Sequence, residues 1–214
     1  MSGIIRFSKG SQELRYLCDS DRELCKLINL IGEYELSLDI NYFEALVKKI
    51  ISQQLSVKAA STICNRVISL CGNINPDVIL RIPESDLREA GVSKLKISYI
   101  KGLSLKIVSG ELDLSKLPSK EDSEVIYLLT DIKGIGQWTA EMFLIFSLGR
   151  PNILSMGDVG LKRAFQWLYQ KESGNLKISD YYEIWNPYNT IASLYLWEAV
   201  NRDYVIKFSS IDEL

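Results

Sequence analysis

Residues 130–165 read TDIKGIGQWTAEMFLIFSLGRPNILSMGDVGLKRAF, and this stretch decides the fold of the chain. Two glycines separated by one residue, Gly134 and Gly136, predict a tight turn between helices. Apolar residues at helical spacing then predict a helix over 137–148, which a glycine and a proline end. A further helix is expected to begin at Asp158. Because a helix that starts at glycines has unpaired N–H groups, the turn is expected to bind an anion.

The rest of the chain repeats this helical pattern. Its 214 residues are 47% hydrophobic and 24% charged, which is ordinary for a globular protein with a sizeable core. The periodicity predicts about ten helices and no convincing strand pair, so the expected fold class is all-α. The expected helices span 22–31, 41–52, 57–70, 76–82, 84–90, 93–109, 137–148, 159–169, 179–184 and 187–201, with one more leading into the glycine turn and a loop over 173–177.

The side-chain inventory excludes several chemistries. The chain has no histidine, which removes Ser-His and Cys-His nucleophiles. Cys18 and Cys25 are seven residues apart, as are Cys64 and Cys71, and no CxxC motif occurs. We therefore expect buried free thiols rather than a zinc site.

The charge balance gives no general attraction to nucleic acid. The net charge is −2 and the isoelectric point is near 5.4. Any DNA contact must then use backbone N–H groups and local clusters of cations. The clusters in the sequence are Lys94, Lys96, Lys101 and Lys106, and Lys162 with Arg163.

The sequence also carries no targeting or spanning segment that we recognise. No apolar run reaches about 18 residues, and the first residues lack the apolar core of a secretory signal. We expect an intracellular protein with no membrane association.

Residues 133–153 and 157–165 resemble the helix–hairpin–helix–GPD superfamily of DNA glycosylases, and most of all its AlkA/Mag-type 3-methyladenine DNA glycosylases. The likeness covers the hairpin, the loop and the aspartate in order, and extends over roughly residues 20–205. It implies one helix–hairpin–helix unit over 1–214, made of two helical lobes around a cleft. Lobe A is expected over about 1–40 plus 151–214, and lobe B over about 41–150 with the hairpin at 131–137.

The resemblance makes Asp158 the catalytic residue, at the cleft between the lobes. An aspartate is also a common helix N-cap, and the two interpretations are compatible because the positive end of a helix favours a carboxylate. A fixed anion would stabilise the cationic sugar that forms as a base departs.

Three residues are assigned to the base pocket by the same resemblance: Trp138, Trp185 and Met142. Trp138 stands where strand-cleaving relatives have a lysine, so we expect hydrolysis without lyase activity; a core tryptophan is the alternative. The stretch from Trp185, WNPYNTIASLYLW, resembles the family's WxPxRxxAxxxLW, with Asn189 in place of arginine, and its last tryptophan, Trp197, is interpreted as core. An aromatic beside the catalytic aspartate is also replaced, by Val159.

The turn SQQLSVKAAS over 52–61 resembles the family loop that wedges a side chain into the duplex, and Gln54 occupies that place. A plain helix–helix turn with solvated glutamines is the alternative. In the family, hairpin carbonyls also bind a monovalent cation, which would be Na⁺ or K⁺ at Thr130, Ile132 and Ile135. No other cofactor is expected. The predicted DNA contacts are Gln53, Gln54, Ser56, Lys58, Lys133, Gly134, Ile135, Gly136, Thr139 and Lys162.

The predicted function is a monofunctional DNA glycosylase of base excision repair that flips out and removes 3-methyladenine and 7-methylguanine. A glycosylase for uracil or for another damaged or mismatched base, and a non-catalytic DNA-binding module, are the alternatives. The expected partner is damaged double-stranded DNA, bound by a monomer located in the cytoplasm, nucleoid or nucleus.

Overall fold

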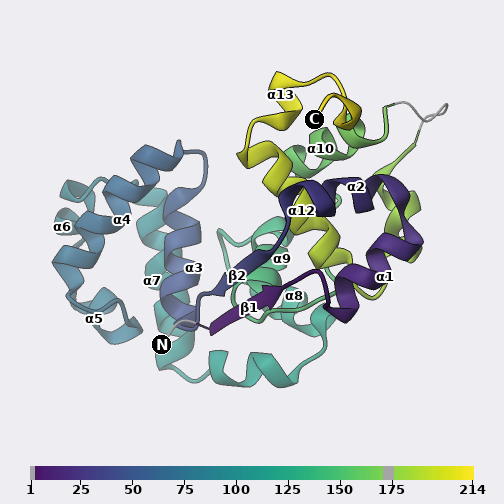
Figure 1. Cartoon of the computed structure of the whole chain (residues 1–214). Helices are drawn as coiled ribbons and strands as arrows, with labels where there is room; N and C mark the ends of the chain where they lie inside the picture. The colour runs from purple at the N-terminus through teal and green to yellow at the C-terminus, as the bar shows by residue number, and fades with distance from the viewer. Residues whose placement is uncertain (1–2, 171–175) are drawn as a thin grey trace. The chain divides into compact units, whose positions relative to one another are not determined.

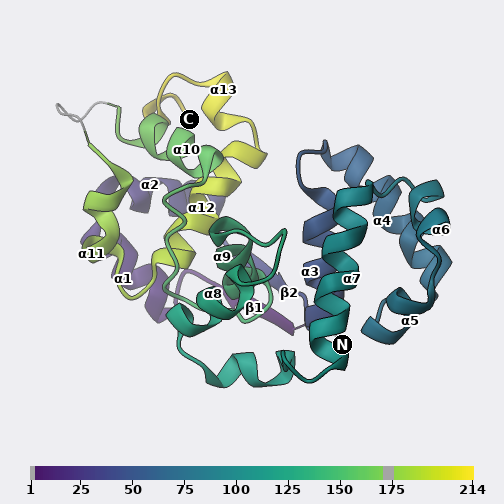
Figure 2. The same ribbon diagram turned by 180° about the vertical axis from the view of Figure 1, so that it is seen from behind.

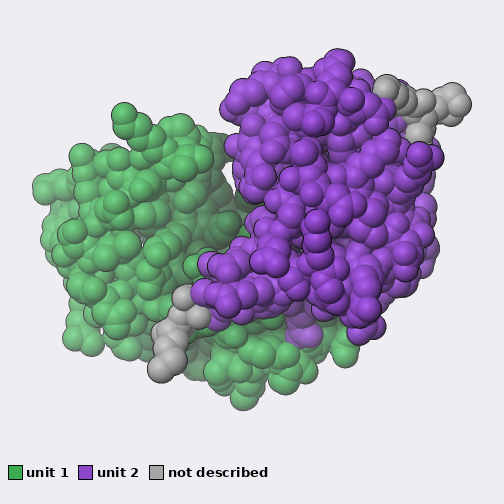
Figure 3. All heavy atoms as spheres, in the orientation of Figure 1, with its two compact units in different colours: residues 1, 39–148 green, residues 2–38, 149–214 purple. Residues whose placement is uncertain are grey.

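The computed structural model describes residues 3–170 and 176–214, and the chain divides into two compact units (Figures 1 and 3). Unit 1 is Asp39–Leu148, and unit 2 combines the segment that ends at Leu38 with Gly149–Leu214. The sequence-based limits were about 40 and 150. Part of the loop expected over 173–177 lies outside the described residues. Within the described ranges, no helix is long and apolar enough to cross a membrane.

The regular elements of unit 1 among the described residues are all helices. Its elements are α3 (Tyr42–Ser52), α4 (Val57–Cys71), α5 (Pro76–Arg81), α6 (Glu84–Glu89), α7 (Lys94–Val108), the 3₁₀ helix η1 (Leu114–Ser119), α8 (Asp122–Thr130) and α9 (Gln137–Phe146). Helix α7 packs against α3, α5 and α6, and α9 packs against α8 and α3 (Figures 1 and 2). Side chains cap four of these α-helices, at Asn41, Ser56, Asn75 and Ser93.

Unit 2 is built around a helix that is buried on almost every side. Its elements are β1 (Gly3–Phe7), α1 (Gln12–Ser20), α2 (Arg22–Ile31), β2 (Tyr34–Leu38), α10 (Val159–Leu168), η2 (Ile178–Tyr181), α11 (Tyr182–Trp185), α12 (Asn189–Asn201), α13 (Tyr204–Lys207) and η3 (Ile211–Glu213). Helix α12 packs against α2, α10 and α13. Because it is enclosed in this way, its buried positions are not confined to one stripe.

The two strands correct the expectation that the chain has no strand pair. β1 and β2 pair antiparallel, from Gly3 opposite Leu38 to Phe7 opposite Tyr34. Two helices separate the strands in sequence, so the pairing has no hairpin-turn motif by which it could be predicted. The small sheet leaves the class all-α.

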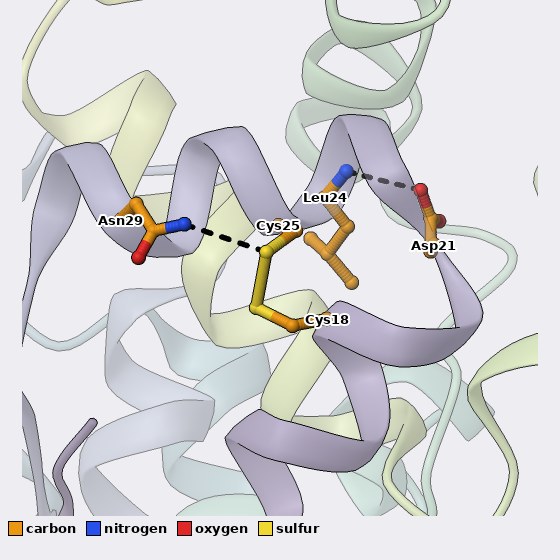
Figure 4. Close-up of a disulfide and its surroundings, with 5 residues drawn as sticks. All are labelled: Cys18, Asp21, Leu24, Cys25 and Asn29. Carbon is orange, nitrogen blue, oxygen red and sulfur yellow. Dashed lines mark hydrogen bonds between the residues drawn. A yellow bond between two sulfur atoms is a disulfide. The ribbon is translucent and has the colours of Figure 1, made fainter. Parts of the chain in front are cut away.

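The cysteines also depart from the prediction of four free thiols. Cys18 in α1 and Cys25 in α2 form a disulfide with their Cα atoms 4.4 Å apart, whereas Cys64 and Cys71 are free (Figure 4). Both pairs are seven residues apart. The chain turns back between the first pair, but the second pair lies in one helix, where seven residues span roughly 10 Å and no bridge can form.

Asp21 stands at that turn and ties the helices of unit 2 together. Its side chain is buried, and Oδ1 accepts the N–H of Leu24 at 3.0 Å, which caps α2 (Figure 4). Oδ2 accepts Trp185 Nε1–H at 2.8 Å and the hydroxyl of Tyr169. A buried carboxylate needs such donors to offset its lost hydration.

Replacing Asp21 with asparagine should therefore destabilise the fold. Asparagine keeps the shape but turns one acceptor oxygen into a donor that faces two other donors. We expect the free energy of unfolding in urea to fall by about 2–4 kcal/mol. The exposed neighbour Asp19 is the control. Asp19→Asn should change the free energy of unfolding by less than about 0.5 kcal/mol. Equal effects of the two changes would contradict this role of Asp21.

Candidate functional site

The glycine turn joins α8 to α9 and depends on one close contact. Gly134 has φ +92°, a conformation that side chains disfavour. A Cβ atom there would also fall within 3.0 Å of three ring atoms of Tyr99, which projects from α7. Gly136 differs, because a Cβ atom there meets nothing within 4 Å. Glycine is therefore needed at the two positions for different reasons. At 134 it allows the close packing against Tyr99, and at 136 it leaves the start of α9 open.

The first turn of α9 has the features of an anion site. Gly136 is its N-cap, and within the described residues no side chain caps the helix. A helix start without a side-chain cap directs backbone N–H groups outward and favours an external anion. Lys133 and Trp138 are exposed beside this helix start, and Trp138 keeps 44% of its surface. This arrangement suits a phosphate better than a neutral ligand.

The turn between α3 and α4 lies beside the glycine turn. Gln53 Nε2 donates to the carbonyl oxygen of Gly134 at 2.7 Å, and a hollow of about 540 Å³ is lined by both turns and by the start of α7. Gln54 is exposed with φ +58°, and Ser56 caps α4 through the N–H of Ala59. Lys58 is exposed on the first turn of α4.

The lysines of α7 form less of a basic patch than their sequence spacing suggests. Lys96 and Lys101 each donate to two backbone carbonyls of unit 1. Lys106 pairs with Glu111 and with Asp131, 3.1 Å away, and these hydrogen bonds raise the pKa of its ammonium group. Most of this positive charge is therefore used inside the unit.

Asp158 is the half-buried N-cap of α10 in unit 2. Its Oδ1 accepts the N–H of Leu161 at 2.7 Å and the indole N–H of Trp197 at 3.1 Å. Trp197 belongs to α12, so the enclosed central helix of the unit orients this carboxylate. The sequence predicts a core position for Trp197. Its hydrogen bond to Asp158 is seen only in the folded structure, because 39 residues separate the two in sequence.

Several predicted site residues lie in the interior. Trp185 is fully buried, with its N–H on Asp21, so the structure places it in the core of unit 2 rather than in a pocket wall. The side chains of Met142, Thr139 and Ile135 are also buried, in unit 1. Lys162 is exposed on the helix that Asp158 begins.

Asn189, which stands where the family pattern has arginine, is a structural residue here. It is buried, and its Nδ2 donates to Asn152 Oδ1 at 2.7 Å and to the carbonyl of Tyr182 at 3.1 Å. The shorter side chain ties the loop before Asp158 to the start of α12.

The three carbonyls assigned to a cation lie in one short segment. That of Ile132 accepts the N–H of Ile135 at 3.0 Å, which folds the segment into a tight turn. A carbonyl oxygen has two lone pairs, so this bond leaves room for a cation. Thr130, Ile132 and Ile135 thus fit an oxygen-only site, and the Na⁺ or K⁺ there stays a prediction.

Comparison with known proteins decides the family. The model of the HhH-GPD superfamily base excision DNA repair proteins matches residues 47–187, which include the glycine turn and Asp158. The chain belongs to this superfamily. The all-α class and the AlkA/Mag-type resemblance are confirmed.

Individual relatives agree over nearly the full length. A crystal structure of a DNA-3-methyladenine glycosidase from Bacillus halodurans matches with a TM-score of 0.87 and 44% identity over 98% of each chain. The Schizosaccharomyces pombe 3-methyladenine DNA glycosylase, solved with abasic DNA, matches with a TM-score of 0.80 and 30% identity over 89% of this chain and 97% of that one. By sequence alone, DNA-3-methyladenine glycosylase 1 of S. pombe is 32% identical over 86% of this chain and 84% of its own.

The two glycines of the hairpin should respond differently to alanine. Gly134→Ala forces a Cβ atom into the Tyr99 ring at a positive φ, so we expect the free energy of unfolding to fall by about 2 kcal/mol or more. Gly136→Ala has open space and should cost less than about 1 kcal/mol. Urea titrations of both variants test this, and equal losses would contradict the close contact with Tyr99.

Proposed function

We propose that this chain is a monofunctional DNA glycosylase of base excision repair that removes alkylated purines such as 3-methyladenine and 7-methylguanine. The single observation that carries the proposal is the carboxylate of Asp158, held at a helix start by the N–H groups of Leu161 and Trp197. The superfamily assignment and the names of the relatives support the substrate class.

The chemistry needs an anion more than it needs an acid. When the C1′–N bond breaks, its electron pair leaves with the purine and positive charge develops on the sugar. The Asp158 carboxylate stabilises that charge, and water then forms the C1′–O bond, loses a proton and leaves an abasic site. An alkylated purine is already cationic, so the departing electron pair neutralises it. The chain has no histidine to protonate a neutral base, which agrees with this choice of substrate.

Binding is proposed to rely on backbone donors rather than on net charge. The uncapped start of α9 and the exposed Lys133 hold phosphate oxygens of damaged double-stranded DNA, and Gln54 fills the space of the extruded base. Trp138 is the exposed indole of this unit and is proposed to stack on the flipped base. Because Trp138 replaces an amine, no Schiff base with the sugar forms there. A hairpin cation and an intracellular, DNA-associated location complete the proposal.

Base-release chromatography from methylated DNA tests the function. We expect the native protein to release 3-methyladenine and 7-methylguanine, and Asp158→Asn to lower the rate by on the order of 100-fold or more. DNA binding should be retained in the variant, because a negative charge is removed. Borohydride should trap no covalent adduct on abasic DNA.

Other outcomes of that assay select the alternatives. Release of uracil or of an oxidised base, without release of methylated purines, would move the substrate to another lesion. DNA binding with no base release by the native protein would make the chain a non-catalytic binding module.

Trp197→Phe tests how the carboxylate is oriented. Loss of the indole N–H removes one of the hydrogen bonds to Asp158, and hydrogen bonds to charged groups contribute about 1.5–3 kcal/mol. We expect base release to slow by about tenfold or more, with DNA affinity unchanged.

Trp167→Phe is the matched control for this change. Trp167 Nε1 also donates one hydrogen bond in unit 2, to the carbonyl of Phe208 at 2.9 Å, without contacting Asp158. Similar rates for the two variants would contradict the role of Trp197.

A further inference from the structure

The turn between α3 and α4 holds a backbone conformation that its own sequence disfavours. Gln54 has φ +58°, in the left-handed region, although it is neither glycine nor asparagine. Such a residue persists only where its surroundings hold it. The N–H of Leu55 bonds to the carbonyl of Ser52 at 3.2 Å, but this local bond does not orient the turn relative to other helices.

Lys96 supplies the first outside support. Its Nζ donates to the carbonyl of Ile51 at 2.7 Å and to that of Gln53 at 2.6 Å. These carbonyls belong to the end of α3, where the helix leaves acceptors unpaired and where positive charge is favourable. Burial lowers the pKa of Lys96, which agrees with an ammonium group that has exchanged water for backbone oxygens.

Gln53 supplies the second support, and it reaches the hairpin directly. Its Nε2 donates to the carbonyl of Gly134 at 2.7 Å, 81 residues away in sequence. Tyr99, one turn beyond Lys96 on α7, fills the space against Gly134. The turn between α3 and α4, the hairpin and α7 are therefore joined pairwise. From α7, Lys96 bonds to the turn and Tyr99 packs on the hairpin, and Gln53 joins the turn to the hairpin.

We propose that Gln53 and Lys96 are positioning residues that set the wedge residue Gln54 at a fixed place relative to the phosphate-binding hairpin. This inference rests on the proposed function. DNA held by the hairpin then always meets Gln54 at the same step of the duplex, so binding of the phosphate and opening of the stack occur together. Gln53 thereby acts through its neighbour Gln54 and through Gly134, whereas the family resemblance predicts that it contacts DNA directly.

The test compares a lesion that must be extruded with one that is already unpaired. Single-turnover rates are measured on a duplex with 7-methylguanine opposite cytosine, and on the same duplex with 7-methylguanine opposite a tetrahydrofuran abasic analogue. Gln53→Met and Lys96→Met keep most of the side-chain volume and remove the donors. Extrusion costs a few kcal/mol only when the lesion is stacked and paired. The reduction in the rate of base release should therefore depend on what lies opposite the lesion.

We expect both variants to slow release from the paired duplex by about tenfold and from the unpaired one by less than about threefold. Gln54→Ala should show the same pattern. Lys101→Met is the matched control: Lys101 Nζ also donates to two carbonyls, those of Leu80 and Ile82, from the same helix but away from the turn. It should leave the ratio of the two rates at the native value.

The outcomes separate the two proposals. A native protein that releases no 7-methylguanine from either duplex refutes the proposed function. A native protein that releases it, with Gln53→Met and Lys96→Met slowing both duplexes equally or neither, refutes the positioning role. The activity on the unpaired duplex also shows whether each variant is folded.

Discussion

The carboxylate of Asp158 is held in its orientation by two N–H donors. Asp158 receives one donor from its own helix and one from Trp197 on α12, and most of unit 2 serves to hold α12 in place. The buried carboxylate of Asp21 performs the matching task deeper in the unit, because it joins α2 to Trp185 and Tyr169. A charged group stabilises a developing cation more effectively when it does not have to reorganise during the reaction, and the two hydrogen bonds hold the Asp158 carboxylate in place beforehand.

Unit 1 shows how an acidic protein can be built to hold DNA. Three lysines of α7 are engaged by carbonyls or carboxylates of the unit itself, so they contribute shape more than attraction. The surface proposed for phosphate is instead the start of α9, which has no side-chain cap and lies beside a glycine that packs on Tyr99. Backbone donors are already oriented and lose little entropy on binding.

Much of the fold and of the candidate site is predictable from the sequence, and the features that are not predictable share a cause. The limits of α2 and the caps at Ser56 and Asp158 follow from local patterns of apolar and capping residues, and the family resemblance was carried by an unbroken motif. The strand pair, the disulfide between Cys18 and Cys25, and the bond from Trp197 to Asp158 all join distant segments or cross a turn. Periodicity shows which residues turn inward, but it does not show which of them contact one another. Trp185 is therefore predicted to line a pocket, whereas it lies in the core of unit 2.

The interaction between Asp158 and a cationic sugar can be measured in a binding experiment. Dissociation constants are compared for two duplexes that differ at one position, where the abasic analogue is either a cationic pyrrolidine or a neutral tetrahydrofuran. We expect the native protein to bind the cationic duplex at least about tenfold more tightly than the neutral one, and Asp158→Asn to abolish this preference. A preference of the same size in both proteins would contradict this expectation, because the charge recognised would then not be that of Asp158.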